Sequence, residues 1–203
     1  MTPEQMSAFF LFALAAAITP GPSNVMVMVA GARGGLVAGL PCLAGVVGGM
    51  ALMMACGQIG LAGVVHAFPS SLLLLKWTGA AFLLWLAWKV ANAGPMADGA
   101  TASPVGFWKA LAFQWVNPKS WIVSVSAAGT YGTGMADQGP GLGLLLPALQ
   151  LGAVFAAAAA PSCALWLASG ASMQRWLRDA RRARRFNIAM GVALAASVLL
   201  VIR

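Results

Sequence analysis

Residues 6–30 read MSAFFLFALAAAITPGPSNVMVMVA, an apolar stretch that is interrupted at Pro20, Gly21 and Pro22. A helix of about 20 apolar residues crosses the roughly 30 Å hydrocarbon core of a bilayer. The stretch therefore predicts a membrane-spanning helix. Because proline removes a backbone donor and clashes with the preceding turn, the same stretch predicts a break near the middle of that helix.

Five further stretches have the length and apolarity of a span. They are residues 35–65, 72–91, 107–128, 141–169 and 186–202, and 107–128 is broken in turn at Asn117-Pro118-Lys119-Ser120. Helix is the natural conformation of such runs in lipid, because each backbone polar group needs an internal partner there. The sequence predicts an all-α integral membrane protein, one domain over residues 1–203, with six transmembrane helices of which helices 1 and 4 are broken.

The composition excludes the other broad classes of protein. Apolar residues make up 61% of the chain and charged residues 8%, whereas charged residues make up about 25% of an average soluble domain. A soluble fold of this size cannot bury so much apolar surface, and disordered chains are poor in apolar residues. The net charge of +8 is spread too thinly for a phosphate-binding surface, so we expect no nucleic-acid partner.

The basic residues predict an orientation. Arg33, Lys89, Lys109 and the arginine-rich run from Arg175 to Arg185 fall in or beside alternate loops, which lie on one side of the membrane. By the positive-inside rule this side is cytoplasmic, and both termini are external. The arginine run either sets this topology alone or also contacts anionic lipid headgroups.

The two halves of the chain resemble each other. Placing Pro20 on Pro118 sets Thr19 on Asn117 and Gly31 on Gly129. Repeat one covers about 1–91 and repeat two about 107–203, separated by a linker rich in Gly, Pro, Ala and Ser at about 92–106. Three spans per half give the repeats opposite topology. Broken helices at matching positions of inverted repeats indicate the binding site of a transporter, in which one repeat rocks against the other.

Lys119 is the one ionisable residue well inside a predicted span. A charge at this depth costs at least about 2.5–3.5 kcal/mol, so an ionisable residue there is expected to have a functional role. No acidic residue lies inside any predicted span, which leaves two interpretations. Lys119 binds the carboxylate of a substrate, or it bonds carbonyls freed by the opposite break and only stabilises the kink.

Other polar residues surround the two breaks. We expect Thr19, Asn24 and Asn117 to supply hydrogen bonds to a substrate, while the breaks themselves are set by Pro20, Gly21, Pro22 and Pro118. Gln114 shares a helix face with Asn117, and either contacts substrate or bonds between helices.

Two further features leave alternatives open. Gly45 and Gly49 form a G-x-x-x-G pair, which allows close helix packing within the subunit or at a homodimer seam. His66 lies at a span end, as an ordinary interfacial residue or as a proton relay.

Other functions lack the residues they need. A thiol-based electron carrier requires paired cysteines, but Cys42, Cys56 and Cys163 contain no C-x-x-C pair. An intramembrane enzyme needs an acid dyad, a metal-ligand cluster or a Ser–His pair at membrane depth, and we expect no catalytic residue, metal or cofactor. A non-transporting scaffold remains the main alternative, although it has no need of aligned breaks around a lysine.

The motifs resemble the LysE/RhtB family of bacterial amino-acid exporters. The resemblance covers essentially the whole chain and rests on TPGP at 19–22, the glycine-rich stretch after it, and NPK at 117–119. It implies an inner-membrane exporter driven by the proton-motive force, with site residues among the two boxes and Asn24. Some members carry an intramembrane acid where this chain has Gly48, Gly49 and Met50. Neutral zwitterions of the homoserine or threonine kind are therefore favoured over basic amino acids.

Overall fold

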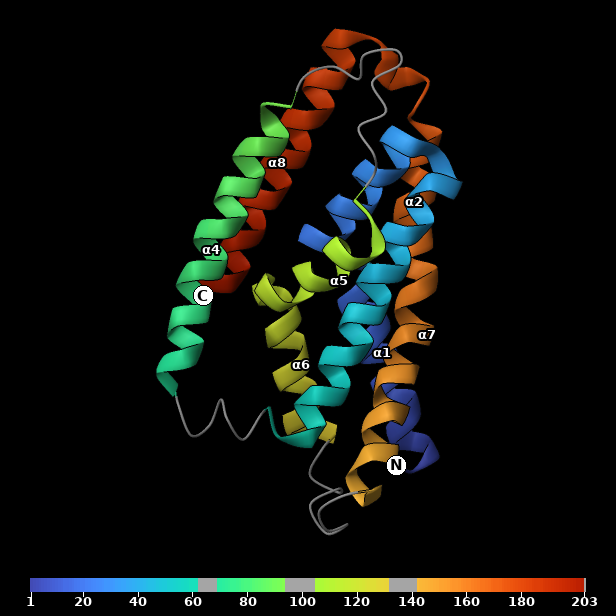
Figure 1. Cartoon of the computed structure of the whole chain (residues 1–203), viewed down its shortest axis with the longest axis vertical. Coiled ribbons are helices and arrows are strands. Elements are labelled where there is room, and N and C mark those ends of the chain that lie inside the picture. Colours follow the sequence, from blue (N-terminus) through green and yellow to red (C-terminus); the bar gives the residue numbers. More distant parts are fainter. Residues whose placement is uncertain (62–68, 94–104, 132–141, 203) are drawn as a thin grey trace.

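The computed structural model describes residues 1–61, 69–93, 105–131 and 142–202 (Figure 1). These residues form helices and no strand, which confirms the all-α prediction. The α-helices are α1 (Pro3–Ile18), α2 (Pro22–Cys56), α4 (Pro69–Ala91), α5 (Phe107–Val116), α6 (Pro118–Tyr131), α7 (Leu142–Ser172) and α8 (Ala180–Ile202). A π-turn, η1 (Gly57–Leu61), extends α2, and a 3₁₀ turn, η3 (Trp176–Arg178), precedes α8. Two described segments, Pro22–Ile59 and Gly143–Ser172, are long and apolar enough to cross a membrane.

Both helix breaks lie where the prolines predict them. Helix α1 ends at Ile18 and α2 begins at Pro22, whereas α5 ends at Val116 and α6 begins at Pro118. Proline is well placed at the first position of a helix, because its missing N–H would have no intrahelical partner there. The structure therefore matches Pro22 with Pro118, two residues on from the register that aligns Pro20 with Pro118.

The chain reverses at Gly35 without leaving the helical conformation on either side. Gly35 has a φ of 76°, the one positive φ among the described residues. A side chain at Gly39 would lie 3.5 Å from the backbone nitrogen of Gly31, although eight residues of straight helix span about 12 Å. Helix α2 thus consists of an N-terminal half, which continues the first predicted span, and a C-terminal half that runs back along it (Figure 1).

Glycines set the closest helix contacts. A Cβ at Gly31 would collide with the carbonyl of Leu167 in α7, and one at Gly170 with the carbonyl of Met28 in α2. A Cβ at Gly191 in α8 would lie 2.7 Å from the carbonyl oxygen of Ala87 in α4. Helices α4 and α8 form a pair at one edge of the molecule (Figure 1), while α2 packs mainly on α7 and α5.

The Gly45–Gly49 pair packs inside the subunit. A Cβ at Gly45 would collide with the carbonyl of Phe107, and one at Gly49 would lie 2.7 Å from Cγ of Gln114. Both neighbours belong to α5, so these glycines are covered by the chain's own helix. The alternative that they form a homodimer seam is wrong.

The arginine-rich run is more helical than the sequence predicts. Helix α8 begins at Ala180 rather than near 186, and the side chain of Asp179 accepts a hydrogen bond from the backbone N–H of Arg182 at 2.9 Å. An aspartate before the first turn satisfies an otherwise unpaired donor, which is why the helix begins this early. His66 and residues 94–104 of the predicted linker lie outside the described residues.

The glycine contacts predict a stability effect. In Gly170→Ala the added methyl meets the carbonyl of Met28, so α2 and α7 must move apart, at a cost of about 1–3 kcal/mol. We expect a lower midpoint of thermal unfolding in detergent than for the wild type. Gly129→Ala is the matched control, since nothing lies within 4 Å of its Cβ position. Equal midpoints for the two variants would contradict this view of the packing.

Candidate functional site

Three hydrogen bonds join the first helix break to the second. The hydroxyl of Ser23 donates to Oε1 of Gln114 at 2.9 Å, and Nδ2 of Asn117 donates to that same hydroxyl at 2.9 Å. Nζ of Lys119 donates to the backbone carbonyl of Thr19 at 2.6 Å. Segments about a hundred residues apart in sequence therefore form one polar centre.

The first break is closed by Asn24. Its Nδ2 donates to the carbonyls of Ala17 and Thr19, each at 2.9 Å, and these carbonyls belong to the last turn of α1, where intrahelical donors are missing. The hydroxyl of Thr19 donates to the carbonyl of Ala15 at 2.5 Å, and this side chain is exposed. Thr19 thus contributes its carbonyl to the centre, and its hydroxyl bonds to its own helix.

The second break is organised by Asn117 and Gln114. Asn117 is 2% exposed, and its Oδ1 accepts from the backbone N–H of Lys119 at 3.2 Å. Gln114 is fully buried; its Nε2 donates to the carbonyl of Ala110, and its Oε1 also accepts from the hydroxyl of Ser120 at 3.0 Å. Gln114 does not line the cavity described next. It makes the interhelical hydrogen bond that was one of its two predicted roles.

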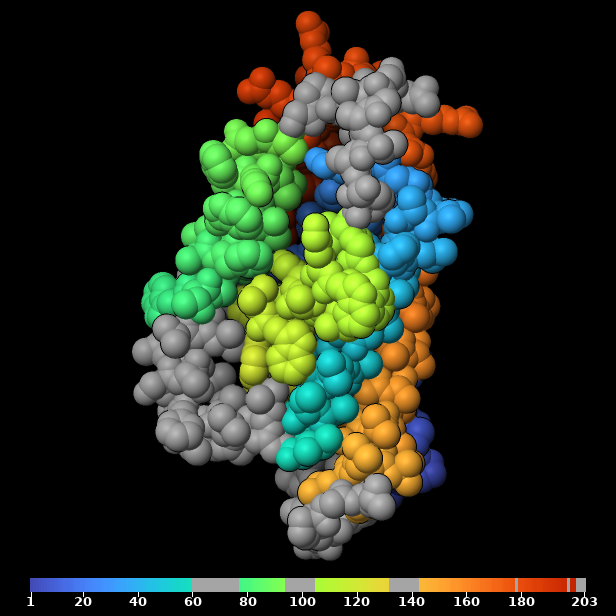
Figure 2. Space-filling view, viewed as in Figure 1, coloured from blue at the N-terminus to red at the C-terminus, as the bar shows by residue number. Residues whose placement is uncertain are grey.

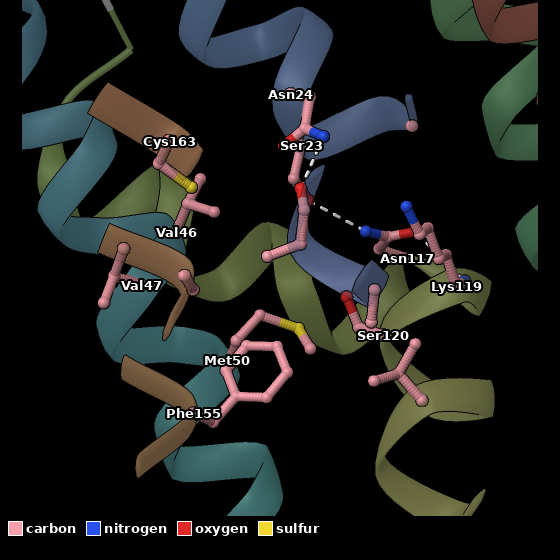
Figure 3. Close-up of a pocket in the computed structure, with 15 residues that line it drawn as sticks. Ser23, Asn24, Val46, Val47, Met50, Asn117, Lys119, Ser120, Phe155 and Cys163 are labelled. Atoms are coloured by element: carbon pink, nitrogen blue, oxygen red, sulfur yellow. Dashed lines mark hydrogen bonds between the residues drawn. The ribbon is translucent and has the colours of Figure 1, made fainter. Parts of the chain in front are cut away.

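A cavity of about 40 Å³ lies against this polar centre (Figure 3). Its polar wall consists of Gly21, Ser23, Asn24, Asn117, Lys119 and Ser120. The opposite wall is apolar and comes mainly from α2 and α7, with Val46, Val47, Met50, Phe155, Ala159 and Cys163. Sites for small molecules usually have about 300–1,000 Å³. The cavity in this conformation is therefore smaller than a typical ligand site.

Gly21 brings Lys119 into the cavity. A Cβ at Gly21 would lie 3.0 Å from Cδ and 3.1 Å from Nζ of Lys119, so any larger residue would have to displace the lysine side chain. Among the described residues that line the cavity, Lys119 carries the one full charge and no carboxylate faces it. Its ammonium is held by a neutral carbonyl alone, which leaves it suited to an anionic group.

The structure adds residues that the sequence reasoning did not select. Ser23 and Ser120 line the cavity and bond to Gln114, and each directly follows a motif proline or the motif lysine, which is a signal that could have found them. Cys163 lines the apolar wall. No local pattern marks it, because it comes from α7. Of the break prolines, Pro20 is exposed, whereas Pro22 and Pro118 are buried.

The apolar all-α fold and a cavity built from helix ends define an integral membrane transporter. Comparison with known proteins agrees: the LysE type translocator family model matches residues 14–202, and the chain belongs to this family. The resemblance inferred from the motifs is thereby confirmed. Members of the family are amino-acid exporters of bacterial membranes and not enzymes.

Relatives of known function are similar over part of the chain. Proteins named cysteine/O-acetylserine efflux protein in Escherichia coli strain K12, Shigella sonnei strain Ss046 and Salmonella typhimurium strain LT2 are each 37% identical over 132 residues. The match covers 64% of this chain and 67% of each relative. No solved structure matches the chain.

The hydrogen bonds of Asn24 predict a second stability effect. Asn24→Ala leaves the carbonyl of Ala17 without its side-chain donor in a partly buried place, at a cost of about 1–3 kcal/mol. The thermal midpoint in detergent should fall. Asn92→Ala is the control, because Asn92 bonds one carbonyl at the exposed end of α4 and should change stability by less than about 0.5 kcal/mol. An unchanged midpoint in Asn24→Ala would refute the capping role.

Proposed function

We propose that the protein exports small neutral amino acids and binds them between the two helix breaks. The observation that carries this proposal is the placement of Lys119, a charged group on the wall of a small cavity without a carboxylate partner among the described residues. A zwitterion brings the missing carboxylate. The absence of an acid in the described lining disfavours a second positive charge on the substrate, as in lysine or arginine.

The polar and apolar walls of the cavity suit a small neutral amino acid. Homoserine and threonine have the small neutral side chains predicted from the sequence, and the cysteine and O-acetylserine named for the relatives belong to the same class. In this proposal Lys119 holds the carboxylate of the substrate. Hydrogen bonds to the substrate come from Ser23, Asn24 and Asn117, and the side chain of the substrate lies against the apolar wall. Gln114 acts behind the site, where it positions Ser23 and Ser120.

The transport cycle is alternating access by two inverted three-span repeats, about 1–91 and about 107–203. Each repeat consists of a broken span, a long span and an edge span. In the first repeat these are α1 with the first half of α2, then the second half of α2, then α4. In the second repeat they are α5 with α6, then α7, then α8. Matching members contact each other, α2 with α7 and α4 with α8. This pairing supports a pseudo-two-fold relation of the kind found in such transporters.

The positively charged end of the molecule faces the cytoplasm in this proposal, with both termini outside the bacterial inner membrane. Nε2 of Gln174 donates to the carbonyl of Arg33 at 3.4 Å, and Nδ2 of Asn187 donates to that of Ala93 at 2.9 Å. These contacts bring the arginine-rich run to the same end as the turn at Gly35. Arg181 and Arg184 line a surface cavity there, which suits anionic lipid headgroups.

Export is coupled to the proton-motive force in this proposal. Transport of a neutral zwitterion moves no net charge, so accumulation outside requires a second ion, and a proton is the simplest. A protonophore should then abolish net efflux of a labelled neutral amino acid from energised vesicles while exchange between labelled and unlabelled substrate persists. Net efflux that survives the protonophore would refute proton coupling and leave the exporter assignment intact.

The role of Lys119 is tested by transport. Loss of a desolvated charge pair costs about 2–5 kcal/mol, so Lys119→Gln should reduce exchange of threonine, homoserine, cysteine and O-acetylserine in proteoliposomes by at least about 30-fold. Lys109→Gln is the control, because Lys109 is exposed on α5 and should transport like the wild type. Both variants are first matched for yield and thermal midpoint.

The outcomes separate the interpretations. Exchange by Lys119→Gln at the wild-type rate would reduce the lysine to a stabiliser of the kink. Failure of the wild type to exchange any amino acid of the set would contradict the substrate class. Exchange of lysine in preference to the neutral amino acids would contradict the argument from the missing acid.

A further inference from the structure

A second cavity lies on a different face of the half-helix that carries Ser23 and Asn24. It has about 180 Å³, and its floor is the N-terminal half of α2 from Pro22 to Arg33. Its walls include Phe82 and Leu86 of α4 and Phe113 of α5. Figure 2 shows a hollow between α4 and α5 with the blue N-terminal part of the chain at its base. We call this cavity the α2–α4 groove.

The groove has the length of one membrane leaflet. Eleven helical residues separate Pro22 from Arg33, which corresponds to about 16 Å, and half of the hydrocarbon core of a bilayer is about 15 Å. Pro22 lies at the helix break, beside the candidate site, and Arg33 lies beside the turn at Gly35. The groove therefore runs from the middle of the molecule to one end of it.

The chemistry of the groove changes along this length. The residues from α2 between its ends, Val25, Met26, Val29 and Ala30, are apolar, and so are the residues from α4 and α5. Arg33 is the one charged side chain among the described lining residues, and it is exposed. An apolar channel with a single cation at its interfacial end complements an amphiphile with an anionic head. Basic pockets between transmembrane helices bind phospholipid headgroups in this way.

We propose that the α2–α4 groove binds one anionic phospholipid molecule from the surrounding membrane. One acyl chain lies along α2 from Arg33 toward Pro22, and the lipid phosphate contacts the guanidinium of Arg33. The chain fills space that the protein's own side chains leave empty behind the half-helix of the candidate site. The inference does not depend on which substrate is exported.

Photo-crosslinking of the full chain tests the site directly. The protein is reconstituted with a trace of phosphatidylglycerol that carries a diazirine near the end of one acyl chain, and labelled peptides are located by mass spectrometry. We expect labelling concentrated on residues 22–33 of α2 and 82–90 of α4. Labelling spread evenly over the lipid-facing helices, as for bulk lipid, would overturn the proposal without any variant.

Two pairs of variants test the acyl chain and the headgroup. Val29→Trp fills the groove and should reduce labelling of α4 at least about tenfold, since bound lipid affinity grows with each buried methylene. Val192→Trp places the same side chain on an exposed part of α8 outside the groove and should leave labelling unchanged. Arg33→Gln should abolish the preference for phosphatidylglycerol over phosphatidylethanolamine, whereas Lys109→Gln, which removes an exposed cation outside the groove, should retain it.

Each result supports or contradicts lipid binding in the α2–α4 groove. Equal loss of labelling in Val29→Trp and Val192→Trp would overturn the acyl-chain site, and a preserved lipid preference in Arg33→Gln would overturn the headgroup contact. If Val29→Trp does not fold, Leu86→Trp narrows the groove from α4 and carries the same expectation. Wild-type transport together with absent groove labelling would overturn the lipid site alone and leave the proposed function standing.

Discussion

The structure depends on one constraint, the need to satisfy backbone carbonyls where two apolar helices are interrupted. Neither lipid nor an apolar protein interior offers such groups a partner, so the chain supplies its own. Asn24 bonds the carbonyls of Ala17 and Thr19, and Lys119 bonds that of Thr19 a second time. Two polar residues of the candidate site, Asn24 and Lys119, thus also make the first break possible.

The same constraint couples the halves of the chain. Because Gln114 accepts from both Ser23 and Ser120 while Asn117 donates to Ser23, neither break can change shape without affecting the other. Rigid walls surround this network, since glycine contacts hold α2 against α7 and α5. A cavity of about 40 Å³ is small for a ligand site, so the proposed rocking of one repeat against the other would have to enlarge it.

The sequence predicted the all-α fold, both helix breaks and the position of Lys119 beside the second break. Apolar length and proline act on the local chain, so these features can be read from short stretches. It also predicted that the chain turns back between the spans ending at residue 30 and beginning at residue 35. It did not predict that this turn needs only one non-helical residue, Gly35, with helix on both sides, since one such residue leaves little trace in a glycine-rich stretch. It predicted a loop over residues 180–185, where α8 has already begun. The many arginines there favoured a loop, although Asp179 caps the helix. Cys163 was missed for a different reason: it lies far from both motifs in the sequence, and only the packing of α7 brings it to the cavity. The hydroxyl of Thr19, which was expected to bond substrate, donates to the carbonyl of Ala15 in the preceding helix.

The two predicted roles of Lys119 are compatible in one mechanism. Its bond to the carbonyl of Thr19 holds the ammonium at the cavity wall. A carboxylate is a stronger acceptor than a neutral carbonyl, because charge-assisted hydrogen bonds are roughly twice as strong as neutral ones. In the proposed mechanism Lys119 turns to the substrate carboxylate, and the carbonyl of Thr19 keeps its bond from Asn24 and is not left unpaired. This exchange would remove the bond of Lys119 between the two breaks, while Ser23 would still join them through Gln114 and Asn117. A ligand shifts a conformational equilibrium by the difference in its affinity for the two states, and in this mechanism the exchange at Lys119 contributes to that difference.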